Sequence, residues 1–295
     1  MSRSYEGVFP ALTTPFLNNK ISPEKLKENI QKYNQYGLSG YVVLGSTGES
    51  VFLSDEESEK MVRAAKESAA PGKKIIVGTA RESTKITLDF TNRMAELDID
   101  AALVRTPYYF KSFMNREALK SYYSSIADQS KVPIIIYNIP QNTGISVESH
   151  LLCELSKHSN IVGIKESSGN LAFLREVKPH LDSSFSFLTG AASIFIPGLQ
   201  LGASGGILAL ADLAPAECVQ LYHLFLQGKR EEASKLQLRL VPLNKAIIET
   251  FGIPGIKYGL DLLDYFGGLP RSPLLPLDEK GKKDMEKILK KTKLL

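Results

Sequence analysis

Eight short apolar runs, each followed by a segment with helical periodicity, constrain the fold of this 295-residue chain more than any other feature. Runs such as Tyr41–Leu44 and Ile134–Tyr137 are almost continuously apolar, as in strands buried on both faces of a parallel sheet. The segments between them carry helix signals, for example the possible capping box of Ser54 and Glu57. The runs begin near Val8, Tyr41, Ile75, Ala101, Ile134, Ile161, Phe185 and Gly205.

This alternation predicts an α/β protein with a closed (β/α)8 TIM barrel. A doubly wound open sheet is the main alternative, because it uses the same alternation of strands and helices. Helical stretches after the last run exceed what a barrel needs, so we expect a barrel over 1–228 and a C-terminal helical extension over 229–295. The helices expected near the C-terminus lie at about 215–227, 230–250, 254–264 and 278–293.

The composition narrows the classes of function. A hydrophobic content of 43% and a charged content of 23% are typical of a soluble globular protein, and a net charge of +4 is small for this length. Seven lysines in residues 280–293 predict the solvated face of a surface helix rather than a nucleic-acid or membrane patch. Cys153 and Cys218 have neither a CxxC partner nor a histidine at metal-ligand spacing. We therefore expect a cytoplasmic protein with no metal, no nucleic-acid partner and no membrane span.

Two candidate catalytic residues end neighbouring runs, where the functional side chains of such barrels gather. Lys165 ends the sixth run, and burial of a lysine favours the neutral amine that attacks a carbonyl. Tyr137 ends the fifth run, where a phenol is able to transfer a proton beside that carbonyl. The sequence leaves two alternatives open: Lys165 forms an ion pair with Glu166 or a neighbouring helix, and Tyr137 packs in the core.

The glycine-flanked turn Gly45–Glu49 follows the second run. The hydroxyls of Ser46 and Thr47, together with backbone N–H groups, suit a small carboxylate. An ordinary tight turn or a weak phosphate loop are the alternatives. The turn lacks the Gly-Lys-Ser/Thr of a Walker A loop. It also lacks the G-x-S-x-G sequence of a nucleophile elbow.

Over essentially its whole length the sequence resembles the dihydrodipicolinate synthase and N-acetylneuraminate lyase superfamily. The resemblance implies a (β/α)8 barrel and a class I mechanism that needs neither a metal nor another cofactor. In this mechanism Lys165 forms a Schiff base with pyruvate, and Tyr137 transfers protons to and from the substrate. The motifs that carry the resemblance are PALTTPF at 10–16, GSTGE at 45–49, TPYY at 106–109, YNIP at 137–140 and GIKESSG at 163–169.

The resemblance also assigns the other site residues. It implies that Ser46 and Thr47 bind the pyruvate carboxylate and relay protons, and that the backbone carbonyl of Ile207 lines the pyruvate pocket. Tyr109 matches a tyrosine that enters the active site of a neighbouring subunit. A homotetramer built as a dimer of dimers is therefore expected, with small molecules as the other partners.

One departure from the family pattern bears on the second substrate. At the position of Asn142, dihydrodipicolinate synthases carry an arginine that holds the carboxylate of aspartate semialdehyde, and asparagine cannot form that bidentate contact. The NTG at 142–144, the FGIPGIK at 251–257 and the ending at 267–275 look closer to 4-hydroxy-2-oxoglutarate aldolases, although these typically carry asparagine where Thr47 stands.

These features rank three functions. We expect first the cleavage of 4-hydroxy-2-oxoglutarate to pyruvate and glyoxylate. The alternative enzyme is a 4-hydroxy-tetrahydrodipicolinate synthase, which condenses pyruvate with aspartate semialdehyde. A non-catalytic sensor of 2-oxo acids is the third reading, which the presence of both Lys165 and Tyr137 disfavours.

Overall fold

The computed structural model describes residues 5–295, which form two compact units. The first unit comprises Ile76–Ile207 together with the residues up to Gly7. The second comprises Val8–Ile75 and Leu208–Leu295, so segments from both ends of the chain build it. Within residues 5–295, no helix is both long and apolar enough to cross a membrane.

The fold is a (β/α)8 barrel with additional C-terminal helices. The sheet has the strand order β1-β10-β9-β8-β7-β6-β5-β4, and a parallel bridge from Ala11 to Val42 joins the chain after β1 to β4. Each strand begins within one residue of a predicted run, so the expected barrel is confirmed and the open sheet is wrong. The strands are β1 (Gly7–Pro10), β4 (Gly40–Val43), β5 (Lys74–Gly78), β6 (Ala101–Arg105), β7 (Ile134–Asn138), β8 (Ile161–Glu166), β9 (Ser186–Thr189) and β10 (Gly205–Leu208).

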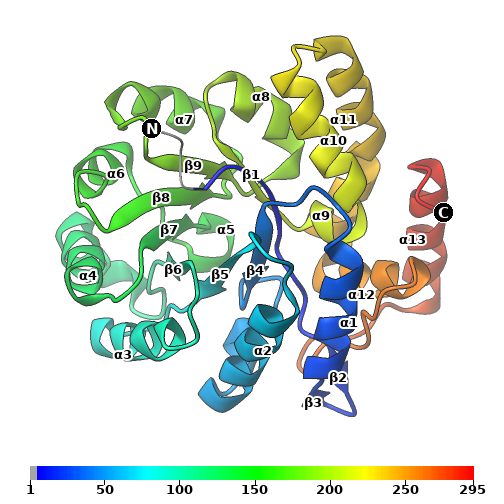
Figure 1. Ribbon diagram of the computed structural model, residues 1–295, viewed down its shortest axis with the longest axis horizontal. Helices are drawn as coiled ribbons and strands as arrows, with labels where there is room; N and C mark the ends of the chain where they lie inside the picture. Colours follow the sequence, from blue (N-terminus) through cyan, green and yellow to red (C-terminus); the bar gives the residue numbers. More distant parts are fainter. Residues whose placement is uncertain (1–4) are drawn as a thin grey trace. The chain divides into compact units, whose positions relative to one another are not determined.

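In the first unit, strands β6 to β9 are parallel neighbours with helices outside them (Figure 1). Ile136 pairs with Ile164, which pairs with Phe187, and all three side chains are buried. Such continuous burial explains why these runs lack the polar alternation of a half-exposed strand. The helices of this unit are α3 (Thr84–Ala95), α4 (Arg116–Gln129), α5 (Pro140–Thr143), α6 (Ser149–Leu155), α7 (Leu171–Val177) and α8 (Phe195–Gln200).

In the second unit, two helices from the N-terminal half pack against each other: α1 (Pro23–Tyr33) and α2 (Asp55–Ser68). The predicted capping box starts α2, because the Ser54 hydroxyl accepts from the Glu57 N–H and the Ser54 N–H donates to the Glu57 carboxylate. A short antiparallel hairpin, which the sequence did not indicate, precedes α1. Its strands are β2 (Phe16–Leu17) and β3 (Lys20–Ile21).

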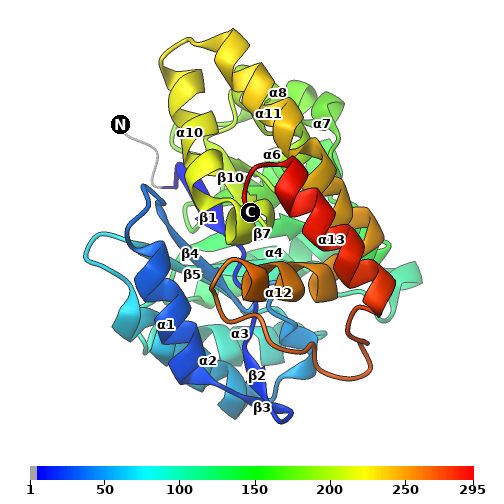
Figure 2. The ribbon, with the colours of Figure 1, turned by 90° about the vertical axis from the view of Figure 1, so that its right-hand side faces the viewer.

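The C-terminal helices complete the second unit, and Figure 2 shows α13 beside α11 and α12. On α13, Met285 and Leu289 are buried while most of the lysines are exposed, as predicted for a surface helix. The division of the chain at residue 228 stays a prediction. These helices are α9 (Leu210–Leu213), α10 (Pro215–Leu226), α11 (Arg230–Lys245) with a π-helical turn (Ala246–Thr250), α12 (Gly252–Leu262) and α13 (Glu279–Lys291). Short 3-10 turns cover Ser50–Phe52, Lys111–Phe113, Lys178–His180 and Ala192–Ile194.

Candidate active site

Lys165 and Tyr137 lie side by side at the ends of β8 and β7 in the first unit. The two residues are partners in the parallel register of these strands, which places both side chains at the same level. The Lys165 amine nitrogen lies 4.2 Å from the centre of the Tyr137 ring. Both residues are buried, with exposed fractions of 4% and 6%. The structure therefore brings together the two residues predicted to perform the chemistry.

The predicted alternative, an ion pair between Lys165 and Glu166, is wrong. Successive residues of a strand point to opposite faces, and Glu166 bonds elsewhere. Its carboxylate accepts hydrogen bonds from the Asn138 side-chain amide and from the Ser168 backbone N–H, both at 2.5 Å. Burial raises the pKa of the Glu166 carboxyl, although these hydrogen bonds partly oppose the shift. Among residues 5–295, Lys165 has no carboxylate partner.

Asn138 ties the ends of β7 and β8 together. Its side-chain oxygen accepts from the Val147 N–H at 2.9 Å, while its amide donates to Glu166. Its backbone carbonyl accepts from the Ser167 N–H at 2.9 Å. This network fixes the backbone on either side of Tyr137 and Lys165. From the sequence, Asn138 was predicted only as part of the YNIP motif, and this structural role was not predicted.

Ser46 and Thr47 lie in the second unit, in the turn after β4. Both residues are half-buried. The turn is held internally, because the Glu49 N–H donates to the Ser46 carbonyl at 3.1 Å and the Gly48 N–H donates to the Gly45 carbonyl at 3.1 Å. The hydroxyls thus come from an ordered turn, as the motif predicts. Their action together with the residues of the first unit stays a prediction.

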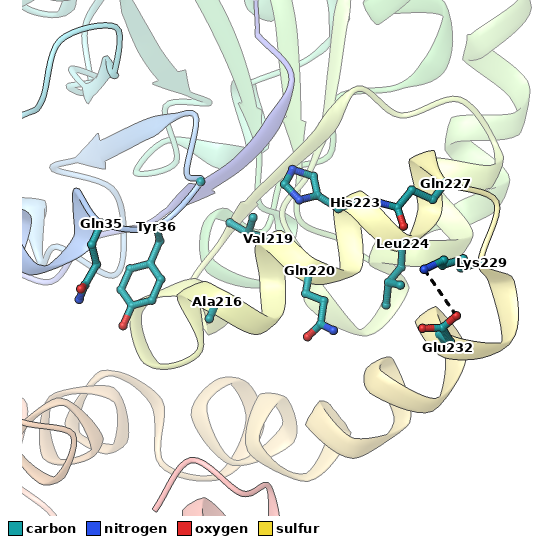
Figure 3. A pocket seen from close by; sticks show the side chains of 11 residues that line it. Gln35, Tyr36, Ala216, Val219, Gln220, His223, Leu224, Gln227, Lys229 and Glu232 are labelled. Carbon is teal, nitrogen blue, oxygen red and sulfur yellow. Dashed lines mark ion pairs between the residues drawn. The ribbon is translucent and has the colours of Figure 1, made fainter.

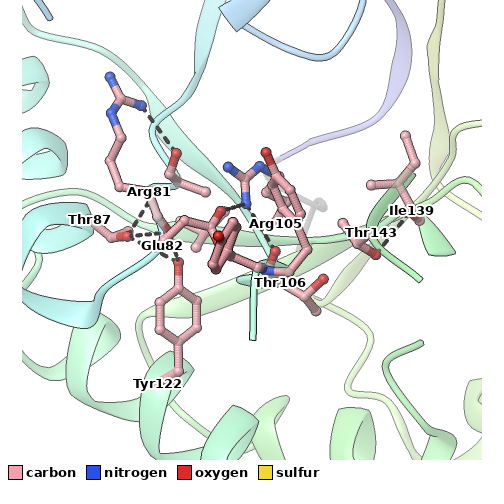
Figure 4. A network of polar contacts seen from close by, with 12 residues as sticks. Arg81, Glu82, Thr87, Arg105, Thr106, Tyr122, Ile139 and Thr143 are labelled. Atoms are coloured by element: carbon pink, nitrogen blue, oxygen red, sulfur yellow. Dashed lines mark hydrogen bonds and ion pairs between the residues drawn. The ribbon is translucent and has the colours of Figure 1, made fainter. Parts of the chain in front are cut away.

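Tyr109 lies in the exposed loop after β6, and its side chain is 74% exposed. The Glu82 carboxylate holds this loop, since it accepts from the backbone N–H groups of Tyr108 and Tyr109, each at 2.9 Å. Figure 4 shows Arg105 contacting both Glu82, at 2.9 Å, and the carbonyl of Thr106, at 3.1 Å. Glu82 and Arg105 follow no periodic pattern, so their role in holding this loop was not predicted from the sequence. The role of Tyr109 in a neighbouring subunit stays a prediction.

Asn142 and Ile207 differ in their surroundings. Asn142 belongs to the short helix α5, where its N–H donates to the Ile139 carbonyl at 3.0 Å and its side chain is exposed. The neighbouring Thr143 is buried and donates its hydroxyl to the same carbonyl (Figure 4). Ile207 is fully buried in β10. Their predicted contacts with substrate stay predictions.

A groove of about 510 Å³ lies elsewhere in the second unit. Side chains along α10, among them Gln220 and His223, form one wall, and Gln35 and Tyr36 contribute from the chain after α1 (Figure 3). None of the predicted site residues lines this groove. In residues 5–295 no group of three or more His, Cys, Asp or Glu side chains is arranged to hold a metal ion.

Comparisons with known proteins agree with the motifs. The sequence model of the Dihydrodipicolinate synthetase family matches residues 4–292. A 4-hydroxy-tetrahydrodipicolinate synthase of Methanothrix thermoacetophila is 35% identical over 291 residues, which cover 97% of each chain. The structure of dihydrodipicolinate synthase from Aquifex aeolicus is 32% identical, with a TM-score of 0.93 over 98% of this chain and 99% of that one.

A further solved structure, described as the first monomeric dihydrodipicolinate synthase variant, has a TM-score of 0.94 and 29% identity. The alignment covers 99% of this chain and 98% of the chain of that variant. The resemblance read from the motifs is therefore confirmed. The chain belongs to the dihydrodipicolinate synthetase family and is a lyase of the class I pyruvate aldolase type.

Proposed function

We propose that this lyase acts through a Schiff base between the Lys165 amine and pyruvate. The observation that carries the proposal is the buried Lys165 amine, which lies 4.2 Å from the centre of the Tyr137 ring. Such an amine attacks the keto carbon of a 2-oxo acid, and water leaves as the imine forms. The Tyr137 hydroxyl then transfers protons to and from the substrate. A carbon–carbon bond to an aldehyde forms or breaks at the methyl carbon of the bound pyruvate.

The other roles in this proposal rest on the family motifs. The hydroxyls of Ser46 and Thr47 bind the pyruvate carboxylate, and the carbonyl of Ile207 lines the pocket. Tyr109 acts in a neighbouring subunit of a cytoplasmic homotetramer, a role that its exposed side chain supports. Light scattering tests the assembly. A protein that is monomeric at the assay concentration would exclude a role for Tyr109 in the active site of a neighbouring subunit.

The first candidate for the second substrate is now aspartate semialdehyde, condensed with pyruvate as in a 4-hydroxy-tetrahydrodipicolinate synthase. Related proteins are named 4-hydroxy-tetrahydrodipicolinate synthase, which supports this candidate. The ranking of the two reactions expected from the motifs is therefore reversed. The second candidate is 4-hydroxy-2-oxoglutarate, cleaved to pyruvate and glyoxylate. Asn142 favours it, because an exposed neutral amide stands where the synthases carry an arginine.

Borohydride trapping tests the Schiff base itself. Wild-type protein treated with pyruvate and borohydride should gain one reduced pyruvyl group per chain, located on Lys165 by peptide mass spectrometry. Lys165→Ala should remain unlabelled, and Lys32→Ala, a change at an exposed lysine on α1, should label as the wild type does. A folded wild-type protein that binds pyruvate but gains no mass would favour the sensor reading.

A direct comparison of the two reactions chooses the second substrate. Pyruvate consumption with aspartate semialdehyde is measured against pyruvate release from 4-hydroxy-2-oxoglutarate, at matched enzyme concentration. A preference for condensation of a hundredfold or more would exclude the cleavage, and the reverse preference would exclude the synthase. Asn142→Arg should raise condensation activity if the missing charge limits it, with Gln141→Arg on the same short helix as the control.

A further inference from the structure

A fully buried ion pair in the second unit joins the GSTGE turn to the C-terminal helices. The Lys257 amine lies 2.7 Å from a carboxylate oxygen of Glu49, and both side chains are 0% exposed. Lys257 belongs to α12 and ends the FGIPGIK segment. Burial lowers the pKa of the Lys257 amine, and the neighbouring Glu49 carboxylate opposes that shift. The GSTGE and FGIPGIK motifs, which are far apart in the sequence, thus meet at one contact.

Lys257 also binds two backbone carbonyls. Its amine donates to the Thr14 carbonyl at 2.8 Å and to the Leu269 carbonyl at 3.0 Å, and it lies 4.4 Å from the centre of the Phe16 ring. With Glu49, these contacts give the ammonium three oxygen partners, the number of its protons. The amine therefore links the PALTTPF segment, the GSTGE turn and the segment after α12.

Two further contacts hold the turn. The Thr14 hydroxyl donates to the Gly48 carbonyl at 2.6 Å. The backbone N–H of Arg271 donates to the second carboxylate oxygen of Glu49 at 2.8 Å. Leu44 and Glu49, at the two ends of the turn, have φ angles of 60° and 54°. Residues with side chains adopt this left-handed conformation only where the surroundings impose it. The contacts of Lys257 and Thr14 supply that constraint around Ser46 and Thr47.

A buried ion pair is weak as a source of stability, because its desolvation offsets its attraction, and an apolar pair often replaces it without loss. Its presence beside this turn therefore calls for an explanation other than stability. We propose that Lys257, acting through Glu49 and Thr14, is a positioning residue that holds the Ser46–Thr47 turn in the shape that binds the carboxylate of the 2-oxo acid. The proposal rests on the proposed function, in which this turn binds that carboxylate. It gives the C-terminal helices a part in selecting substrates that carry a carboxylate.

The test compares pyruvate with methyl pyruvate, whose ester lacks the negative charge. For each ketone, the concentration that gives half-maximal borohydride labelling of Lys165 is measured by intact mass spectrometry. Wild-type protein should prefer pyruvate. Lys257→Met should reduce this preference by at least about tenfold, as expected for disturbed hydrogen bonds to a charged group. The preference is a ratio within one preparation, so partial loss of folded protein does not change it.

A second variant removes the danger that an unpaired buried carboxylate unfolds the protein. The double variant Lys257→Met/Glu49→Gln has no unpaired charge, and it should stay folded while losing the same preference. Lys32→Met removes an exposed ion pair with Asp264 in the same unit and should keep the wild-type preference.

The outcomes separate the two proposals. A wild-type preference in the double variant would overturn the positioning role and leave the Schiff-base proposal intact. A wild-type protein that neither ketone labels would overturn the Schiff-base proposal, and the positioning role with it. An equal loss in Lys32→Met would show a general effect of removing a lysine, which also contradicts the positioning role.

Discussion

Replacing Asn138 with alanine should destabilise the first unit and change how its stability depends on pH. The change removes two side-chain hydrogen bonds, one to the Glu166 carboxylate and one from the Val147 N–H. Val147 and one carboxylate oxygen of Glu166 are then left without these partners in a buried region. Each such unsatisfied group costs about 1–3 kcal/mol, so we expect the free energy of unfolding to fall by roughly 3 kcal/mol at pH 8.

The pH dependence follows from Glu166, whose pKa burial raises above its ordinary value. The folded protein binds this proton more tightly than the unfolded chain, so stability falls as pH rises from the ordinary glutamate range through the raised pKa. Below the raised pKa the carboxyl is neutral in the folded wild type and in folded Asn138→Ala alike, so its share of the penalty disappears. At pH 4 we therefore expect the loss in Asn138→Ala to shrink to roughly half, the part due to Val147.

Urea denaturation followed by circular dichroism measures both values. The control is Asn142→Ala, which changes an exposed asparagine and should alter the free energy of unfolding by less than about 0.5 kcal/mol. A loss below about 1 kcal/mol in Asn138→Ala at pH 8, or an equal loss at pH 4 and pH 8, would refute the reasoning.

Three further changes have expected outcomes. Arg271→Met removes a bidentate contact with Glu57 and should cost about 2 kcal/mol at pH 7. Because Arg271 lowers the pKa of Glu57, the part of this loss that comes from the ion pair should fade as pH drops through that lowered pKa, while the part from the guanidinium hydrogen bonds to the Phe52 and Asn19 carbonyls should remain. Urea midpoints at pH 7 and pH 3 check this. Glu82→Gln should speed amide hydrogen exchange at Tyr108 and Tyr109 relative to the rest of the unit, and equal rates would contradict its role in the loop. Tyr109→Ala should leave the unfolding free energy within about 0.5 kcal/mol but lower kcat roughly a hundredfold, and unchanged kcat would exclude its catalytic role.

Much of the fold could be predicted because the signals are local. The apolar run at Ile134–Tyr137 becomes β7, and Ser54 with Glu57 forms the cap expected at the start of α2. The closeness of Lys165 and Tyr137 was also predictable, because both end neighbouring parallel strands and so reach the same edge of the sheet. The motifs then supplied the chemistry.

The supporting contacts could not be read from the sequence. Glu49 and Lys257 are separated by roughly 200 residues, and no periodicity connects them. A lysine in an amphipathic helix is usually solvated, so the full burial of Lys257 runs against the expectation for its residue type. Glu82 similarly binds backbone N–H groups. Almost every residue carries such a group, so the sequence does not indicate which ones Glu82 binds. The choice between the two second substrates depends on how Asn142 contacts the substrate. The contacts that build the fold do not determine this.

The discontinuous second unit has a consequence for synthesis on the ribosome. The GSTGE turn emerges early, but Glu49 cannot form its ion pair until Lys257 is translated, roughly 200 residues later. At about 5–20 residues per second, this delay lasts roughly 10–40 s. The nascent N-terminal segment therefore spends that interval without its partner helices and is accessible to chaperones.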